Sequence, residues 1–515
     1  MVTSALFLGW LLLPSHIPFF GRSKLLSVAS IVAMIGFTLV VFLESIRVIQ
    51  AFSLWKFSSK SVDPIPMTPP AGLRVAVLTT IVPSHEPIPM VTTTLRAMRE
   101  LRYDGRVDVW ILDEENHPEV RRVAAELGVN YFTRHGSPRY NRRRGPFRRR
   151  SKAGNHNAWR AEHESDYDVV AQMDPDHVPF PDFLQRTLGY FRDPDMAFVV
   201  APQVYGNIGE GFLAHASAAQ AYLFHGVIQR GANGLGAPLL IGTNHLYRTS
   251  AWRQIDGYQD SIIEDHLTSL TIHASTNPRT RVPWKGVYTP DILAVGQGPS
   301  TWTDYFKQQK RWAYGVWEVV LHHNRRHMPR LRRKQRLSYG LIQSFYPSVA
   351  TTWTLGNAVT ALYLVFGVPS VFLQWPVWLS LWGAAVAAHL CLYRWLRRFN
   401  LAEHERREWG IREIVLTLFA GPIYVAAAFS AIFRRRLTYE VTAKGRTSRA
   451  DGLGTFRLHV VWAVFAALTI GASVLLGYHY STLRAWALFT FVIVTIPVLL
   501  ALGRRRSNVV RIDRR

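Results

Sequence analysis

Apolar residues are concentrated in long runs at both ends of the chain, and a polar segment separates these runs. Residues 26–45 carry no charge before Glu44, and a helix of roughly 20 apolar residues suffices to cross the hydrocarbon layer of a bilayer. Residues 4–20 are also apolar, although prolines interrupt them. The pattern predicts two membrane-spanning helices within residues 1–50.

Apolar runs return after the polar segment. Residues 337–393 contain two of them joined by a short turn at Gly367, which predicts a hairpin of spanning helices. Residues 456–503 predict a second hairpin, which would return the basic tail, residues 504–515, to the side of the polar segment. We therefore expect six spans, with both termini cytosolic.

Residues 394–433, between the two hairpins, have a different pattern. Residues 394–412 are rich in Arg and Glu, and residues 413–433 are apolar but contain Gly421-Pro422. Because the loops on both sides are basic, a single crossing would place one basic loop outside. We predict that 394–412 is a surface helix and that 413–433 is interfacial or re-entrant.

The polar segment, residues 60–325, contains no run long enough to span a membrane. Apolar strand patterns at 73–82 and 107–115 alternate with helical patterns at 91–101 and 119–128. Alternation of this kind predicts an α/β domain with a mostly parallel sheet. In such sheets ligands bind beyond the carboxyl ends of the strands. These ends would carry Pro83, Ser84, Glu86, Asp113 and Glu114. No Gly-rich dinucleotide fingerprint follows the first strand, which argues against a nicotinamide cofactor.

Composition restricts the class of protein further. The chain has 515 residues and a formal net charge of +25. Its basic clusters lie close to apolar segments, as the positive-inside rule describes, and no nucleic-acid-binding motif accompanies them. We expect no nucleic-acid partner. We interpret the basic run 139–152 as solvated or lipid-facing, except at Lys152. The single cysteine, Cys391, excludes a disulfide within one chain.

Asp174 and Asp176 follow the strand pattern that ends at Met173, one residue apart. Alternate residues of an extended segment point the same way, and paired carboxylates suit Mg²⁺ or Mn²⁺ that also binds a diphosphate. A solvated turn is the alternative, because short patterns of this kind are common.

Two later motifs also have alternative interpretations. Glu264 and Asp265 close an apolar run at the start of a helix. There they either favour the helix dipole or supply a general base for a sugar hydroxyl. Gln308, Arg311 and Trp312 lie at helical spacing. They suit a diphosphate and a sugar ring, or the membrane interface.

Together these motifs resemble those of the processive glycosyltransferases of family 2, the group of cellulose, chitin and hyaluronan synthases. The stretch Ser151-Lys152-Ala153-Gly154-Asn155-His156-Asn157 is similar to the family's Lys-Ala-Gly-Asn-x-Asn stretch. Gly242-Thr243-Asn244, followed by Arg248, resembles its acceptor-side strand, and Tyr439–Gly445, within residues 434–455, resembles the gating loop of cellulose synthases.

The resemblance implies a GT-A type domain and assigns roles to individual residues. Asp265 would be the catalytic base, and Asp174 and Asp176 would hold the metal. The nucleotide-sugar would contact Pro83, Ser84, Glu86, Asp113, Lys152, Asp174, Gln308, Arg311, Thr442 and Lys444. The acceptor would contact Trp312, Glu264, Gly242, Thr243 and Asn244.

The implied activity is polymerisation of a UDP-sugar, chiefly UDP-glucose, into a β-linked polysaccharide exported across the plasma membrane. The expected partners are the UDP-sugar, the growing polysaccharide, membrane lipids and an extracytoplasmic accessory protein. Two alternatives stay open, a synthase that uses UDP-N-acetylglucosamine and a non-processive enzyme that adds one sugar to a carrier. The pattern does not give the sugar or the linkage. A transporter would not explain the ordered carboxylates.

Overall fold

The computed structural model describes residues 2–18, 28–367, 375–435, 437, 451–478 and 481–512. The two nucleotide contacts expected from the gating loop, Thr442 and Lys444, lie outside the described residues.

A seven-stranded sheet in the order β3-β2-β1-β4-β7-β6-β8 forms the centre of the polar domain. The strands are β1 (Arg74–Ile81), β2 (Arg106–Asp113), β3 (Asn130–Phe132), β4 (Val169–Met173), β6 (Met196–Val200), β7 (His245–Arg248) and β8 (Lys285–Tyr288). All neighbouring strands pair in parallel except β7, which is antiparallel to β4 and β6. A second small sheet pairs β5 (Val178–Pro179) with β9 (Ala294–Val295). The predicted α/β domain with a mostly parallel sheet is confirmed.

Alternation along β1 explains why the sheet is buried on both faces. Val75 and Val77 pack into one core with helices α3 (Ile88–Arg99) and α4 (Pro118–Glu126), whereas Ala76 and Leu78 pack into another with Trp159 of α5 (Lys152–His163). Successive side chains of a strand point to opposite faces, so a continuous apolar run requires helices on both sides.

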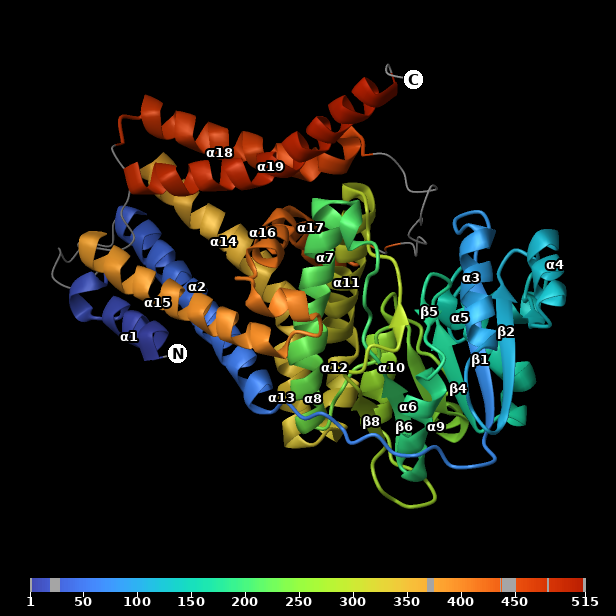
Figure 1. Ribbon diagram of the computed structural model, residues 1–515. Coiled ribbons are helices and arrows are strands. Elements are labelled where there is room, and N and C mark those ends of the chain that lie inside the picture. Colours follow the sequence, from blue (N-terminus) through green and yellow to red (C-terminus); the bar gives the residue numbers. More distant parts are fainter. Residues whose placement is uncertain are drawn as a thin grey trace.

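The helices of the domain alternate with the strands from β1 to β3, as the sequence predicts, and later in the chain several follow one another directly. They are α3 (Ile88–Arg99), α4 (Pro118–Glu126), α5 (Lys152–His163), α6 (Phe183–Thr187), α7 (Phe212–Leu223), a π-helix (Phe224–Gln229), α8 (Arg230–Gly234), α9 (Thr249–Gln254), α10 (Glu264–His273), α11 (Trp302–His322), α12 (Asn324–His327) and α13 (Arg333–Gln343). Figure 1 shows α7 and α11 between the sheet and the apolar helices.

Five helical segments of the described chain are long and apolar enough to cross a membrane: 30–59, 345–366, 376–399, 453–475 and 483–503. They belong to α2 (Val28–Ser59), α14 (Phe345–Phe366), α15 (Trp375–Leu396), α18 (Arg457–Leu475) and α19 (Ser481–Ile512). A further pair, α16 (Ile411–Phe419) and α17 (Gly421–Ile432), is bent by 47° and forms either a broken span or a re-entrant loop. The bend adjoins Pro422, which cannot continue a helical hydrogen-bond ladder.

Three segments differ from the sequence-based expectations. In the described part of the apolar run expected to span at 4–20, the helix α1 (Val2–Leu11) is ten residues long and ends at Leu11, and a 3-10 turn at Pro14–His16 follows it. This helix is shorter than a crossing requires. The run from Leu337 to Phe366 is divided at Ser344 into α13 and α14.

The third difference concerns residues 394–412, where we expected one surface helix. After α15 ends, the chain forms two 3-10 helices, Arg397–Phe399 and Glu403–Arg407, around a buried guanidinium. Arg397 is buried and pairs with Glu405 and Glu413. A helix would carry Arg397 and Glu405 two turns apart. The compact turn instead brings them together and keeps the buried charge paired.

Candidate active site

Parallel pairing places the ends of three strands at one edge of the sheet. Strands β1, β2 and β4 run in the same direction, so the residues after them, 82–86, 113–117 and 174–177, open at that edge. Strand β7 runs the opposite way, so the residues that precede it, Gly242 to Asn244, join the same edge. The topology thus gathers motifs that lie far apart along the chain.

Lys152 joins two of these motifs directly. Its Nζ donates to Oδ1 of Asp174 and to the backbone carbonyl of Gly242. The backbone N–H of Asp174 donates to Oγ1 of Thr243 at 2.9 Å, and Thr243 in turn donates to Oδ1 of Asn244 at 3.1 Å. Thr243 and Asn244 are buried, so they hold the loop in place beneath Gly242.

Glu264 and Asp265 begin helix α10 beside this cluster. A Cβ atom built on Gly242 would lie 3.5 Å from Oδ2 of Asp265, which places the carboxylate against the loop. Desolvation and the charge of Glu264 raise the pKa of Asp265 to about 7, although Arg311 and Lys152 oppose the shift. Desolvation also raises the pKa of Glu264. Such a carboxylate is suited to general-base chemistry near neutral pH.

Helix α11 approaches the start of α10 closely because it carries a glycine at the contact. A Cβ atom on Gly315 would lie 2.6 Å from the side chain of Ile263, which directly precedes Glu264. One turn earlier on the same helix, Arg311 lies near enough for its charge to lower the pKa of Asp265. Gln308 and Trp312 are half-buried on the same helix.

Asp174, Asp176 and His177 form a group that could hold a metal ion. One ligand atom from each lies within 4.8 Å of the others. Asp176 and His177 are buried, and Nδ1 of His177 lies 3.3 Å from Oδ1 of Asp176. Nε2 of His177 is buried without a hydrogen-bond partner among the described residues. This donor set fits a divalent cation, and the sequence motif did not predict His177 as a ligand.

The loops after β1 and β2 contact each other at the predicted nucleotide end of the site. The backbone N–H of Ser84 donates to Glu115 at 2.8 Å, and Glu86 accepts from the N–H of Val82 at 2.8 Å. Ser84 is exposed, and Pro83 is half-buried. These two residues border the opening of the site.

Asp113, unlike the exposed Ser84, is buried. It is 0% exposed and accepts hydrogen bonds from the N–H groups of Glu115 and His117 and from the Tyr131 hydroxyl. Asp113 therefore shapes the loop after β2. Its neighbour Glu114 binds the buried guanidinium of Arg134.

Arg134 also holds the backbone of the basic run 139–152, which we interpreted as solvated or lipid-facing except at Lys152. Its guanidinium donates to the carbonyls of Tyr140, Arg148 and Ser151. The side chains of the arginines at 142–144, 149 and 150 are exposed, but the backbone is folded around Arg134 and leads into α5 at Lys152.

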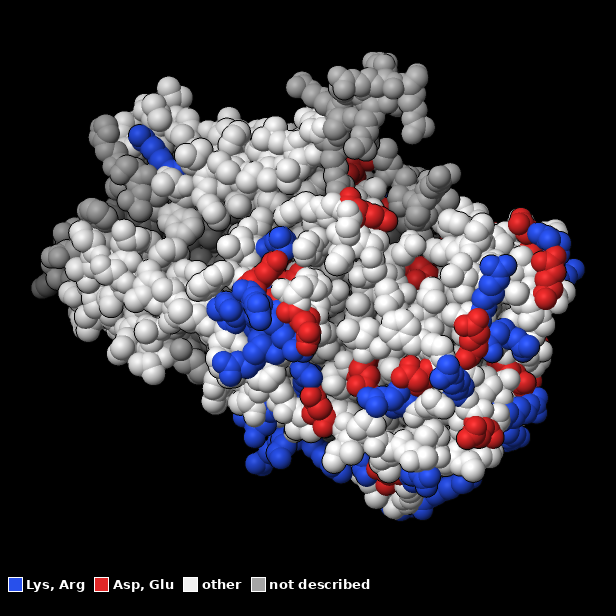
Figure 2. Space-filling model, in the orientation of Figure 1, with Lys and Arg blue, Asp and Glu red and all other residues white. Residues whose placement is uncertain are grey.

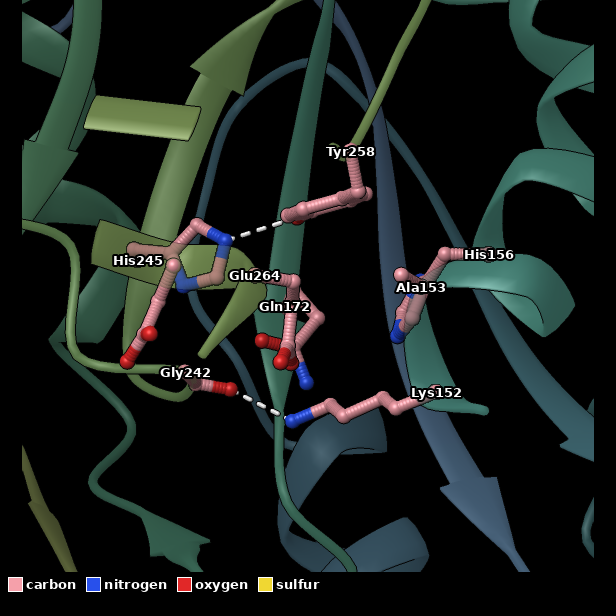
Figure 3. A pocket seen from close by; sticks show the side chains of 9 residues that line it. Lys152, Ala153, His156, Gln172, Gly242, His245, Tyr258 and Glu264 are labelled. Atoms are coloured by element: carbon pink, nitrogen blue, oxygen red, sulfur yellow. Dashed lines mark hydrogen bonds between the residues drawn. The ribbon is translucent and has the colours of Figure 1, made fainter. Parts of the chain in front are cut away.

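A small cavity of about 10 Å³, which is space for about one water molecule, adjoins the predicted base. Figure 3 shows side chains that line it. Its lining residues are Lys152, Ala153, His156, Gln172, Gly242, His245, Tyr258, Glu264 and Asp265. His156, Gln172, His245 and Tyr258 had no predicted role. Nε2 of His245 lies 2.7 Å from the Tyr258 hydroxyl. Desolvation lowers the pKa of His156 and His245, so both imidazoles are neutral near pH 7.

Part of the chain is similar to known proteins. Residues 76–315 match the family described as "Glycosyltransferase like family 2". A UDP-forming cellulose synthase of Dictyostelium discoideum is 29% identical over 240 residues, which are 45% of this chain and 22% of that protein. The UDP-forming cellulose synthase of Xanthomonas axonopodis pv. citri (strain 306) is 26% identical over 302 residues, 57% of this chain and 38% of the relative. The chain therefore spans less than half of the length of these curated relatives.

Among solved structures, the mannosyltransferase PcManGT from Pyrobaculum calidifontis in complex with GDP-Man and Mn²⁺ is 14% identical, with a TM-score of 0.49. The match covers 79% of this chain and 100% of that one. The family match covers the segment that carries the sheet, Asp174, Asp265 and Arg311. Residues 76–315 thus match a family of glycosyltransferases, and the chain is similar to cellulose synthases over about half of its length.

Proposed function

We propose that the chain is a processive, inverting glycosyltransferase that polymerises a UDP-sugar, chiefly UDP-glucose, into a β-linked polysaccharide and exports it across the plasma membrane. The observation that carries the proposal is the grouping of Asp265, Gly242, Lys152 and Asp174 at one edge of the sheet. Helix α11, whose Gly315 meets the residue before Glu264, lies between the sheet and the apolar helices (Figure 1).

Asp265 acts as the base of the proposed reaction. The acceptor hydroxyl loses its proton to the Asp265 carboxylate while its oxygen attacks the anomeric carbon. The bond from that carbon to the diphosphate breaks on the opposite face, so an α-linked donor gives a β-linkage and UDP leaves. Lys152 and Arg311 supply positive charge for the leaving diphosphate, since charge developed in a transition state is best stabilised by groups already in place.

A divalent cation fits beside these residues, and Asp174, Asp176 and His177 would hold it. When bound, it neutralises negative charge on the diphosphate oxygens. Carboxylates suit both Mg²⁺ and Mn²⁺, whereas the imidazole of His177 favours the softer ion. We therefore expect Mn²⁺ to support more turnover than Mg²⁺.

At the nucleotide end, we propose that Pro83, Ser84 and Glu86 border the uridine and that Asp113 positions the loop around it. Gln308 would contact the diphosphate. Trp312 would stack on the terminal sugar of the acceptor, with Glu264 and residues 242–244 beside it. Thr442 and Lys444, assigned by resemblance, would close over the nucleotide. Both curated relatives are UDP-forming cellulose synthases, which favours UDP-glucose as donor.

The first test is turnover by the purified full chain in detergent or vesicles, with Mn²⁺ or Mg²⁺ and a panel of radiolabelled UDP-sugars. The proposal expects UDP release and a product of heterogeneous, high molecular weight from one donor, both lost in Asp265→Asn. Glu119→Gln, which removes an exposed carboxylate from α4, is the matched control and should keep full activity.

The other outcomes identify the alternatives. A product that carries one added sugar would identify a non-processive enzyme acting on a carrier. Turnover of UDP-N-acetylglucosamine alone would identify a synthase of the chitin or hyaluronan type. Full activity in Asp265→Asn would remove Asp265 from the role of base.

A further inference from the structure

The turn between α15 and α16 exposes large apolar side chains beside arginines. Trp395 is 40% exposed, Trp409 is 57% exposed and Ile411 is 65% exposed. Residues 394–411, here called the 394–411 surface, follow the apolar part of α15 directly and end where α16 begins. Exposed tryptophans at the end of an apolar helix are typical of the level of the lipid headgroups.

Buried ion pairs hold the 394–411 surface in one conformation. The guanidinium of Arg397 binds the carboxylates of Glu405 and Glu413 and the backbone carbonyl of Glu405. All three side chains are buried. Breaking such a pair would leave a charge without a partner in the interior. The exposed residues around this cluster therefore have fixed positions relative to one another.

Three arginines of the 394–411 surface have no carboxylate partner among the described residues. They are Arg394, Arg398 and Arg407. The Arg398 guanidinium lies 4.4 Å from the centre of the Trp395 ring, and Arg394 lies 6.0 Å from that of Trp409. Arg406 and Arg412, in contrast, pair with Glu403 and Glu408. Figure 2 shows basic and acidic side chains gathered between the uncharged apolar helices and the charged domain.

We propose that the 394–411 surface binds the headgroups of anionic phospholipids. Guanidinium groups form paired hydrogen bonds with phosphate oxygens, and each basic residue near an anionic membrane adds to the attraction. The tryptophans set the depth in the bilayer, while Arg394, Arg398 and Arg407 supply the charge that distinguishes anionic from zwitterionic lipid. This inference does not depend on the identity of the transferred sugar.

The test counts phosphatidylglycerol and phosphatidylcholine that stay bound to the full chain in detergent, by native mass spectrometry. The triple variant Arg394→Gln/Arg398→Gln/Arg407→Gln should bind phosphatidylglycerol at least about tenfold more weakly, given the contribution of each basic residue. Its binding of phosphatidylcholine should not change. Raising the salt concentration should reproduce the loss in the natural chain, because exposed charges are screened.

Two variants keep the test specific. Arg96→Gln/Arg99→Gln/Arg102→Gln removes the same charge from exposed positions in and after α3 and should retain phosphatidylglycerol. The triple replacement of Arg394, Arg398 and Arg407 by Lys keeps the charge and should retain most of the binding. Equal loss in the α3 variant would show attraction to net charge alone. Unchanged phosphatidylglycerol binding in the Gln triple would overturn the proposal.

Discussion

Gly242 has a backbone conformation that disfavours a side chain, and it adjoins the predicted base. Its φ is +80°, and a Cβ atom would lie 3.5 Å from Oδ2 of Asp265. We expect Gly242→Ala to lower kcat strongly, since the strained loop displaces both the base and the carbonyl that accepts from Lys152. The backbone strain alone costs about 1–2 kcal/mol. Steady-state UDP release and the thermal unfolding midpoint measure the two effects.

Gly236→Ala is the control that separates the effect of backbone strain on stability from an effect on catalysis. Gly236 also has a positive φ, +68°, but nothing lies within 4 Å of its added Cβ. It should show a comparable fall in the unfolding midpoint with kcat retained. If both variants lose kcat equally, the effect of Gly242 is one of stability and not of contact with the base.

The pH dependence of turnover should report the environment of Asp265. The base acts only when ionised, so kcat/KM should fall as the pH drops through about 7, the pKa that desolvation and Glu264 give it. Glu264→Gln removes a negative charge that raises this pKa, and the acid limb should therefore move to lower pH. The measurement is a pH profile of kcat/KM for both proteins.

The direction of the movement is the decisive observation, because it follows from the sign of the charge that Glu264→Gln removes. Glu119→Gln, distant from the pair on α4, should leave the profile in place. An acid limb that stays fixed in Glu264→Gln would mean that the charge of Glu264 does not act on the base.

At the scale of elements, a buried hydrogen-bond network connects α11 with the bent pair α16 and α17. The Tyr424 hydroxyl donates to Oε1 of Gln309 at 2.7 Å, and Nε2 of Gln309 lies 3.4 Å from Oε1 of Gln220 on α7. Gln220 donates to Thr417 at 3.0 Å. Since Gln309 adjoins Gln308, this network fixes the rotation of the helix that carries Arg311 and Trp312.

Tyr424→Phe leaves the Gln309 amide oxygen without its donor, which costs about 1–3 kcal/mol for a buried group. We expect a lower unfolding midpoint in detergent, a similar loss in Gln309→Leu, and a double variant that loses less than the sum. Gln308→Leu removes the adjacent amide outside this network and should change the midpoint little. Additive losses would contradict a direct interaction between Tyr424 and Gln309.

Elements with a strong period were predictable from the sequence. The continuous apolar run of β1 and the spacing of α3 and α4 gave those elements within a few residues, because burial on both faces of a sheet leaves an unambiguous pattern. The division at Ser344 was not predictable, since α13 and α14 together read as one apolar run. The turn at Arg397 was missed because its fold depends on Glu413, which lies beyond the turn itself.

The candidate site was predictable where motifs carry its residues. The positions of Lys152, Asp174 and Asp265 followed from their motifs. The cavity lining was not predictable, because His245 enters it only when β7 pairs antiparallel with β4. No local pattern encodes that pairing. His177 is an intermediate case, since its residue type suited a metal but its burial became apparent only in the fold.

At the scale of the whole molecule, a contact of Asp451 indicates on which side of the membrane the chain lies after the bent pair. Asp451 accepts hydrogen bonds from the N–H groups of Trp302 and Thr303, at 3.2 and 2.9 Å. These groups begin α11, which belongs to the α/β domain. The chain before the bent pair, at Glu405, contacts His215 of α7 at 2.9 Å. Both ends of the pair therefore contact helices of the domain, and we expect the pair to re-enter the membrane without crossing it.

Single cysteines in a Cys391→Ser background test this topology in sealed vesicles with an impermeant thiol reagent. Glu403→Cys before the pair and Gly454→Cys after it occupy exposed positions. Both should react from the same side as His135→Cys in the domain, because neither end is separated from α11 by the bilayer. Leu476→Cys, exposed after α18, should react only from the opposite side. Labelling of Glu403→Cys and Gly454→Cys from opposite sides would show that α16 and α17 together form a sixth span, and the hydrogen bonds of Asp451 would then have to break in the membrane.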